Sequence, residues 1–362
     1  MEKITVNCIR EASQAEGLAG EWRALESCAS LPTQSFDFFK AALATFVTED
    51  ELCVVAARDG DRLVGVLPLC RARGALAPWR IVGTSELYEP NDALAADAAA
   101  ADQLAAAVAG LPAPAVLERV PVDSPLIPAL RKAFKGRLVV RPDSFSPTLP
   151  LDARWQEPES CFNSGRRSDF RRAQRHAEKF GAVGLDVLTP APEEVDALMD
   201  EAIAIELASW KKEAGTALGM LPAKASFFKT YARLASERGA LRLAFMRIDG
   251  TPMAMQIAFV FANRYWLFKI GHNDAFSKCS PGTLMMLATL KHAATDGLVA
   301  YEMLGNDEPW IAMWTREQKA YVQVRTYPAN VAGLAASARD GALRFYEKVK
   351  YRLEKRWASK PD

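Results

Sequence analysis

The sequence predicts an α/β protein with two tandem domains, each a central mixed β-sheet flanked by helices, followed by a C-terminal helix. Three observations predict this class. A set of residues recurs once along the chain, each copy contains a β-hairpin pattern, and the second copy continues as strand, helix and strand. A helix that connects two strands of one sheet allows them to run parallel, with the helix packed across the sheet.

The repeat is defined by four matched features. They pair Trp22 with Trp210, Leu31-Pro32 with Leu221-Pro222, Phe38-Phe39-Lys40 with Phe227-Phe228-Lys229, and Asp59-Gly60 with Asp249-Gly250. The members of each pair lie 188 to 190 residues apart. One match would mean little, but four matches at a nearly constant interval indicate a duplicated unit.

Each copy predicts the order helix, helix, hairpin. Apolar, β-rich residues flank the Asp-Gly pair at 52–70 and again at 241–261, and this is a strong hairpin pattern. The second copy continues with a strand at 264–272, a helix from 283 and a strand at 298–304. The matching part of the first copy has no glycine-bearing turn, so we expect the first domain to be degenerate and the second to be active.

The expected domains are 1–150, 151–328 and a basic amphipathic helix at 329–362. The prolines and serines of residues 144–160 predict a linker between the first two.

The composition restricts the class of protein and its location. The formal net charge is only +1, and no run of about 18 apolar residues could span a bilayer. The first residues contain no apolar segment of the kind found in signal peptides, so we expect a cytoplasmic protein. The six cysteines are scattered and the three histidines are isolated, which predicts that no metal is bound.

Several segments carry a resemblance to a known family. They are residues 65–73 (GVLPLCRAR), 164–181, 205–218, 247–259, 265–286 and 302–315. In this order they resemble the GNAT acyltransferase superfamily, in its cellulose-biosynthesis CelD-like branch, which is related to the tandem-GNAT Fem-type transferases. The resemblance implies transfer of an acyl group, usually acetyl from acetyl-CoA, to an amine or hydroxyl of a sugar or of an envelope or exopolysaccharide precursor.

An acyl-CoA enzyme must bind a pyrophosphate, and a helix N-terminus is suited to that anion. The strand at 264–272 leads to Ser280-Pro281-Gly282-Thr283, where a helix is expected to begin. We therefore expect Lys269, Ser280, Gly282 and Thr283 to contact the cofactor. The turn is poorer in Arg, Gln and Gly than is usual in the family, and an ordinary N-cap by Ser280 is the alternative.

Acyl transfer needs a base for the acceptor proton. Glu206 matches the glutamate of the family's Glu, Ser-Trp-Lys helix, whereas His272 and Asp274 lie where the strand before the CoA turn ends. His272 occupies a position that is commonly aromatic in the family. Asp307 begins an acidic-Pro-aromatic motif that the family usually continues with lysine. This chain has Ile311 instead, which predicts either a different acceptor or a loss of activity.

The candidate acceptor-binding residues come from four parts of the second copy. They are Arg167, Arg171, Trp210, Lys211, Gln256, Glu308 and Trp310. Arg167 and Arg171 belong to a basic stretch, SGRRSDFRRAQRHAEK, that predicts one amphipathic helix with a cationic face. That face could contact the phosphates of CoA, of a lipid-linked sugar or of a nucleotide, or it could simply be solvated.

Three alternatives remain open at this stage. One is an aminoacyl-tRNA-dependent transferase of the Fem type, in which the basic helix would bind phosphates, although the near-neutral charge opposes it. A second is a non-catalytic, nucleotide-binding regulator of polysaccharide production. The third concerns the apolar stripe of the C-terminal helix, which either docks on the protein itself or contacts a partner or an anionic membrane. In the membrane case the protein would be peripheral, at the inner face of the membrane.

Overall fold

The computed structural model describes residues 4–74, 77–209, 215–305 and 308–358. The first half contains β1 (Thr5–Ile9), α1 (Ala12–Glu16), α2 (Ala19–Leu25), α3 (Phe36–Phe46), β2 (Glu51–Asp59), β3 (Arg62–Arg71), β4 (Arg80–Ile81), α4 (Thr84–Leu87), β5 (Leu94–Ala95), α5 (Ala98–Ala109), β6 (Ala115–Pro121), α6 (Leu126–Phe134) and β7 (Leu138–Pro150). The second contains α7 (Ser164–Ala177), β8 (Val183–Leu188), α8 (Val195–Leu207), α9 (Pro222–Ser236), β9 (Leu241–Ile248), β10 (Thr251–Phe261), β11 (Arg264–His272), α10 (Pro281–Thr295), β12 (Ala300–Glu302), β13 (Gln318–Thr326) and α11 (Val331–Ala358).

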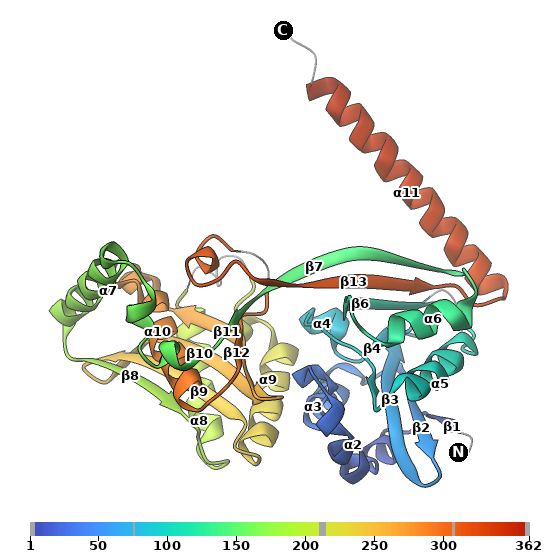
Figure 1. The fold of residues 1–362 in the computed structure, drawn as a ribbon, viewed down its shortest axis with the longest axis horizontal. Helices are drawn as coiled ribbons and strands as arrows, with labels where there is room; N and C mark the ends of the chain where they lie inside the picture. The colour runs from blue at the N-terminus through green and yellow to red at the C-terminus, as the bar shows by residue number, and fades with distance from the viewer. Residues whose placement is uncertain (1–3, 75–76, 210–214, 306–307, 359–362) are drawn as a thin grey trace.

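The predicted α/β class is confirmed, because sheets flanked by helices fill both halves (Figure 1). The larger sheet is mixed, whereas all described strand pairs of the sheet formed by β1 to β5 are antiparallel. The duplicated unit is also present, as α2, α3, β2 and β3 in the first half and α8, α9, β9 and β10 in the second. Both Asp-Gly pairs lie at hairpin turns, where Gly60 and Gly250 have φ angles of 59° and 77°. Glycine adopts such left-handed conformations without steric cost, which explains why the same dipeptide turns both hairpins.

The two halves share one large sheet. It has the strand order β6-β13-β7-β12-β11-β10-β9-β8, beside a separate sheet of β1, β2, β3 and β4 with β5 on β3. Strand β13, near the end of the chain, thus lies between β6 and β7 and is antiparallel to both. The sheet therefore crosses the boundary expected near residue 150.

The prediction of a linker at residues 144–160 is wrong for the first part of that range, because residues 144–150 belong to strand β7. Pro147 and Pro150 suggested a break, since proline has no N–H to donate in a sheet. Their backbone can still accept, however, and the Met303 amide donates to the Pro147 carbonyl at 3.1 Å. Strand β7 pairs with β13 along most of its length and with β12 at its end.

The largest hydrophobic core cluster is built jointly by the two copies of the repeat. Helix α3 packs on helix α9, and the cluster contains Trp22 and Phe38 from the first copy together with Phe227, Tyr231 and Phe259 from the second. Each half therefore completes the core of the other.

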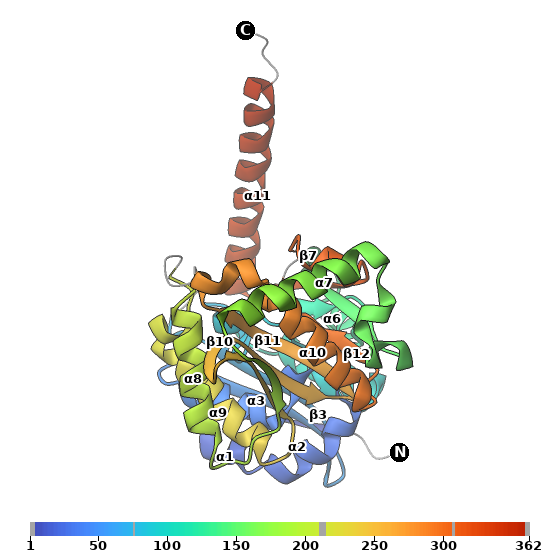
Figure 2. The ribbon, with the colours of Figure 1, turned by 90° about the vertical axis from the view of Figure 1, so that its left-hand side faces the viewer.

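Helix α11 projects away from the body of the protein in both views (Figures 1 and 2). Its first turns are attached through buried Asp340, whose carboxylate accepts hydrogen bonds from Arg325 at 2.9 Å and from the Tyr327 hydroxyl at 3.0 Å. Leu334 and Phe345, on the predicted apolar stripe, are 74% and 72% exposed. The interpretation that the apolar stripe docks on the protein itself is therefore wrong for these two side chains. Within the described part of the chain, no helix combines the length and apolarity needed to cross a bilayer.

Candidate functional site

Strands β11 and β12 form a short parallel pair that ends early. Three residue pairs are in register, from Arg264 with Ala300 to Trp266 with Glu302. Strand β12 stops there, whereas β11 continues to His272 with β10 along its other edge. In an open α/β sheet, ligands bind where the carboxyl ends of strands separate. The end of β11 is therefore the first element of the candidate site.

A β-bulge lies in this continuation of β11. On β10, Ile257 and Ala258 are adjacent, but they pair with Lys269 and Leu267, so that Phe268 is the extra residue. A bulge changes the direction in which the following side chains point. Here the Lys269 ammonium lies 5.2 Å from the ring centroid of Phe228 on α9, which places Lys269 on the face covered by α8 and α9.

The helix predicted from residue 283 is present as α10 and begins two residues earlier, at Pro281. The N-cap alternative for Ser280 is wrong: this residue has φ 50°, in the left-handed region, and its side chain makes no capping hydrogen bond. A Cβ atom built on exposed Gly282 meets nothing within 4 Å. The Thr283 amide donates to the Ser280 carbonyl at 3.0 Å. A 15-residue helix with open space at its N-terminus suits the pyrophosphate of acyl-CoA.

The basic stretch forms helix α7, which packs against α10 and the short 3₁₀ segment before it, Asp274–Cys279 (Figure 2). Buried Phe170 fixes α7 by stacking on Trp314, with ring centroids 6.2 Å apart. Arg171 is exposed, and half-buried Arg167 donates to the Phe162 carbonyl at 3.0 Å. The arginines of α7 thus add positive charge beside the 3₁₀ segment that leads into α10.

Glu206, on helix α8, lies against the end of β11 on the face that α8 and α9 cover. A Cβ atom on Gly271 would be 3.2 Å from both the Cα and the Cβ of Glu206, so any larger residue would require Glu206 to shift by a few tenths of an ångström. The Glu206 side chain is buried, and its Oε2 accepts a hydrogen bond from the Leu218 amide at 2.8 Å. The hydroxyl of Ser209 donates to the Glu206 carbonyl at 2.7 Å. Glu206 therefore fixes the connection between α8 and α9 to the end of β11.

His272, Asp274 and Ser277 form a small polar group at the end of β11. The Nε2 of His272 lies 3.7 Å from Asp274 Oδ1 and 3.4 Å from the Ser277 hydroxyl. The imidazole is about one third exposed, with 31% of its side chain accessible. A partly exposed histidine next to a carboxylate is an arrangement that can take up and release a proton.

The remaining predicted site residues lie elsewhere. Gln256 is 2% exposed and accepts a hydrogen bond from the Tyr301 hydroxyl at 3.3 Å, which does not agree with a place in an open cleft. Glu308 and Trp310 are exposed. The residues Trp210, Lys211 and Asp307 fall outside the described residues.

Ile311, where the family usually has lysine, is 3% exposed and belongs to a core cluster with Trp314. No group of three or more metal-ligand side chains occurs in the described ranges, and the absence of a metal stays a prediction.

A contribution from the first half of the chain was not predicted. Arg119 is 2% exposed with φ 51°, and its guanidinium donates to the Tyr88 carbonyl at 2.5 Å and to Ser146. A more distant contact, 3.4 Å, reaches the carbonyl of Gly305, directly before the acidic-Pro-Trp motif. The available clue was a charged pair inside the apolar strand sequence AVLERV.

Glu89 connects this arginine with the second half. Its carboxylate lies 3.8 Å from the Arg119 guanidinium, and burial raises the pKa of Glu89, while the charges of Arg119 and Lys269 oppose that rise. The first half is therefore close enough to Lys269 to act on it electrostatically.

A comparison with family models identifies the second half. Residues 164–310 match the model described as the acetyltransferase (GNAT) domain. The fold of this half is that of the GNAT acyltransferases. The matched range includes α7, the split between β11 and β12, and the start of α10. The CelD-like branch stays a prediction, because the matched model describes the GNAT domain in general.

Solved structures resemble the whole chain in fold. One is FemX, with a TM-score of 0.58 at 11% identity, covering 90% of this chain and 97% of that one. Another is the C-terminal domain of a proposed lysylphosphatidylglycerol synthetase from Agrobacterium fabrum, with a TM-score of 0.56, 10% identity and coverage of 91% and 96%. A third is a conserved protein of unknown function from Bacteroides thetaiotaomicron, with a TM-score of 0.54 at 7% identity, covering 89% of this chain and 100% of that one. No curated protein matches the sequence.

Proposed function

We propose that the protein is an acyltransferase that moves an acyl group, most simply acetyl, from acyl-CoA to an amine or hydroxyl of a sugar or of an envelope or exopolysaccharide precursor. The observation that carries this proposal is the early end of the β11–β12 pair beside the open N-terminus of α10. The separation of the two strands would make room for an extended thioester arm, and the N-terminus of α10 would bind the anion at one end of it.

The donor would be held by the start of α10 and by α7. The backbone N–H of Gly282 would face the pyrophosphate, and Gly282 would allow close approach because no side chain stands there. The Thr283 amide already donates to the Ser280 carbonyl, so Thr283 would contribute through its hydroxyl. Arg171 would add a charged donor from α7, where its side chain is exposed. The thioester itself supplies the activated carbonyl.

His272 is the best-placed base among the described candidates. Its imidazole is accessible, and Asp274, 3.7 Å away, can orient it and stabilise its protonated form. His272 would take the proton of the acceptor amine or hydroxyl as its nitrogen or oxygen attacks the acyl carbon. The thioester C–S bond would then break, CoA would leave as a thiolate, and the proton held by His272 would pass to that thiolate. Glu206 would act as a positioning residue, since its carboxylate is buried and holds the Leu218 amide.

The acceptor side would be completed by the first half of the chain. Lys269 lies on the face of α8 and α9, where the charge of Glu89 reaches it. The contact of Arg119 with Gly305 would hold the segment that carries Glu308 and Trp310. A polar acceptor such as a sugar would meet Lys269 and the segment with Glu308 and Trp310, which buried Glu89 and Arg119 of the first half would hold in place.

A peripheral membrane position would suit a lipid-linked acceptor. Residues 334–362 carry eight Lys or Arg against four Asp or Glu, and the exposed side chains of Leu334 and Phe345 lie on one side of α11. Basic amphipathic helices bind anionic lipid surfaces through both features. We therefore propose α11 as the membrane contact.

Aminoacyl transfer from tRNA is the second candidate, and the likeness of the whole chain to FemX favours it. In that case the arginines of α7 would bind the tRNA backbone, and affinity would fall steeply with salt. A regulator would instead bind a nucleotide without turnover.

Calorimetric titrations with acetyl-CoA, an aminoacyl-tRNA and a cyclic dinucleotide separate these functions. Saturable binding of acetyl-CoA alone supports acyl transfer. No binding of acetyl-CoA at millimolar concentration removes this proposal, and the other two ligands then decide between the alternatives.

A further inference from the structure

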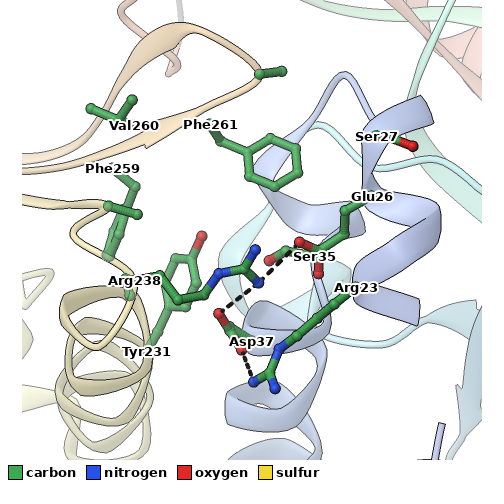
Figure 3. Close-up of a pocket in the computed structure, with 13 residues that line it drawn as sticks. Arg23, Glu26, Ser27, Ser35, Asp37, Tyr231, Arg238, Phe259, Val260 and Phe261 are labelled. Atoms are coloured by element: carbon green, nitrogen blue, oxygen red, sulfur yellow. Dashed lines mark hydrogen bonds and ion pairs between the residues drawn. The ribbon is translucent and has the colours of Figure 1, made fainter. Parts of the chain in front are cut away.

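A cavity of about 360 Å³ lies between the two copies of the repeat (Figure 3). The first copy lines it with the end of α2, the turn after α2 and the start of α3. The second copy contributes α9, the residues just after it and the β10–β11 turn. Its volume falls within the range of small-molecule sites, roughly 300 to 1,000 Å³.

The cavity is separate from the acyl-transfer site. Strand β10 reaches the cavity at Phe259 and approaches the other site at Gln256, which pairs with Ile270. The three residue steps from Gln256 to Phe259 span about 10 Å of strand, and the two side chains point to opposite faces of the sheet. A ligand in the cavity would therefore be a second ligand.

Four charged side chains meet in the cavity, and they come from both halves (Figure 3). The Nη2 of Arg23 lies 2.8 Å from the Asp37 carboxylate. The Nη1 of Arg238 lies 3.1 Å from Glu26 and 3.5 Å from the second oxygen of Asp37. Asp37 thus receives an arginine from each copy of the repeat.

The carboxylates and the guanidinium groups differ in exposure. The Glu26 and Asp37 side chains are only 7% and 5% exposed, whereas Arg23 and Arg238 are 40% and 42% exposed. Glu26 is also directed inward, because its Oε1 accepts the Phe36 amide at 2.9 Å. The guanidinium groups are therefore the more accessible charged groups of the cavity, and the Asp37 carboxylate lies between them (Figure 3).

Each guanidinium retains donors for such a ligand. Arg238 uses only Nη1 for its two carboxylate contacts, and Arg23 uses only Nη2. Their other N–H groups make no hydrogen bond to the described residues. Two guanidinium groups that face one space form a fork for a carboxylate or phosphate oxygen pair.

The rest of the lining is largely apolar. Phe259, Val260 and Phe261 follow the end of β10 along the cavity, and Tyr231 borders it from α9. These side chains suit the ring or short chain of a small organic molecule. Burial also raises the pKa of Glu26, which lowers the cost of neutralising that carboxyl when an anion enters.

We infer that this cavity is a second binding site, for a small organic oxyanion whose carboxylate or phosphate meets Arg23 and Arg238 and whose apolar part lies against Phe259 and Phe261. Because the ligand would contact both copies of the repeat, it would bind the two halves together. The site is thus suited to control their relative position.

The test is calorimetry on the full-length protein with benzoate and phenyl phosphate, which carry the two anion types on one ring, and benzyl alcohol as the uncharged analogue. Both anions should bind saturably and benzyl alcohol should not. Arg238→Lys keeps the charge but loses the fork, so it should weaken binding at least tenfold. Arg233→Lys is the matched control, because Arg233 lies on α9 and pairs with exposed Asp196.

A second variant, Phe261→Ala, should weaken both anions without removing a charge. Thermal unfolding of each variant shows whether it is folded. Presaturation with acetyl-CoA should leave anion affinity unchanged. The inference is overturned if neither anion binds at 10 mM, if the folded Arg238→Lys and Phe261→Ala variants bind as the native protein does, or if acetyl-CoA competes.

Discussion

Phe38 and Phe227 occupy the same position in the two copies of the repeat, and their rings pack edge to face with centroids 5.2 Å apart. Both side chains are buried, at 2% and 0% exposure. Contact between equivalent residues is what two-fold related units produce at a shared interface. The duplicated halves therefore pack like the subunits of a dimer joined in one chain.

Phe227→Ala should lower the free energy of unfolding by about 3–5 kcal/mol, because it leaves a cavity in a core that both halves build. Denaturant unfolding should remain a single transition. Phe180→Ala is the control, since Phe180 is 53% exposed and its loss should cost less than about 1 kcal/mol. Two separate transitions, or equal losses in both variants, would contradict a shared core.

Asp92→Asn should stabilise the protein above neutral pH. Burial raises the pKa of Asp92 from 3.8 to about 7, although hydrogen bonds from the Ser124 hydroxyl and the Ala93 amide oppose the rise. Between these values the native state keeps a proton that the unfolded chain releases, so native stability is lost as pH rises. The asparagine variant avoids this loss, so its free energy of unfolding above neutral pH should be higher by up to about 4 kcal/mol. Unfolding at pH 4 and pH 8 tests it; an advantage that is the same at both values would refute the prediction.

Ile311→Lys should destabilise the protein rather than restore the family's lysine. The side chain is 3% exposed in an apolar cluster, so an ammonium there would lose its hydration without a designed partner. We expect a loss of about 3 kcal/mol or more, against about 1 kcal/mol for Ile311→Val. Thermal unfolding of the two variants provides the comparison. Equal melting temperatures would show that this position accepts lysine.

Replacing Leu334 and Phe345 together with glutamate should abolish sedimentation with phosphatidylglycerol vesicles, because both exposed apolar contacts of α11 are lost. Leu343→Glu is the single-charge control: Leu343 is 53% exposed and lies about 180° around the helix from Leu334. The native protein should not sediment with phosphatidylcholine vesicles. Unchanged sedimentation of the double variant would exclude α11 as the membrane contact.

Much of the fold could be predicted because its determinants are local. The Asp-Gly turns and the apolar runs beside them are local patterns, and they correctly placed both hairpins. Strand order is not local: nothing within residues 318–326 indicates that they lie between β6 and β7. Pro147 and Pro150 also favoured a linker, since the pairing that accommodates them is formed by residues 150 or more positions away.

The candidate site divides in the same way. Pro281 and Gly282 indicated the start of α10, and the basic stretch was correctly predicted to form a helix. Glu89 and Arg119 could not be found, because their importance depends on burial against the other half. Gln256 was misplaced because a polar residue on a strand does not reveal which partner, here Tyr301, it meets inside the core.

The most direct test of the central claim is the affinity of the Gly282→Glu variant for acetyl-CoA. The new side chain meets no protein atom at its Cβ, replaces a helical glycine and puts negative charge in the first turn of α10, so the fold should be stabilised by about 1 kcal/mol. The same charge should repel the pyrophosphate.

Gly20→Glu is the matched control, because Gly20 is also the second residue of a helix, α2, with nothing within 4 Å of its Cβ. Calorimetry should show at least a hundredfold weaker binding of acetyl-CoA to Gly282→Glu and native affinity in Gly20→Glu. Native affinity in a folded Gly282→Glu variant would contradict the assignment of the α10 N-terminus as the acyl-CoA site.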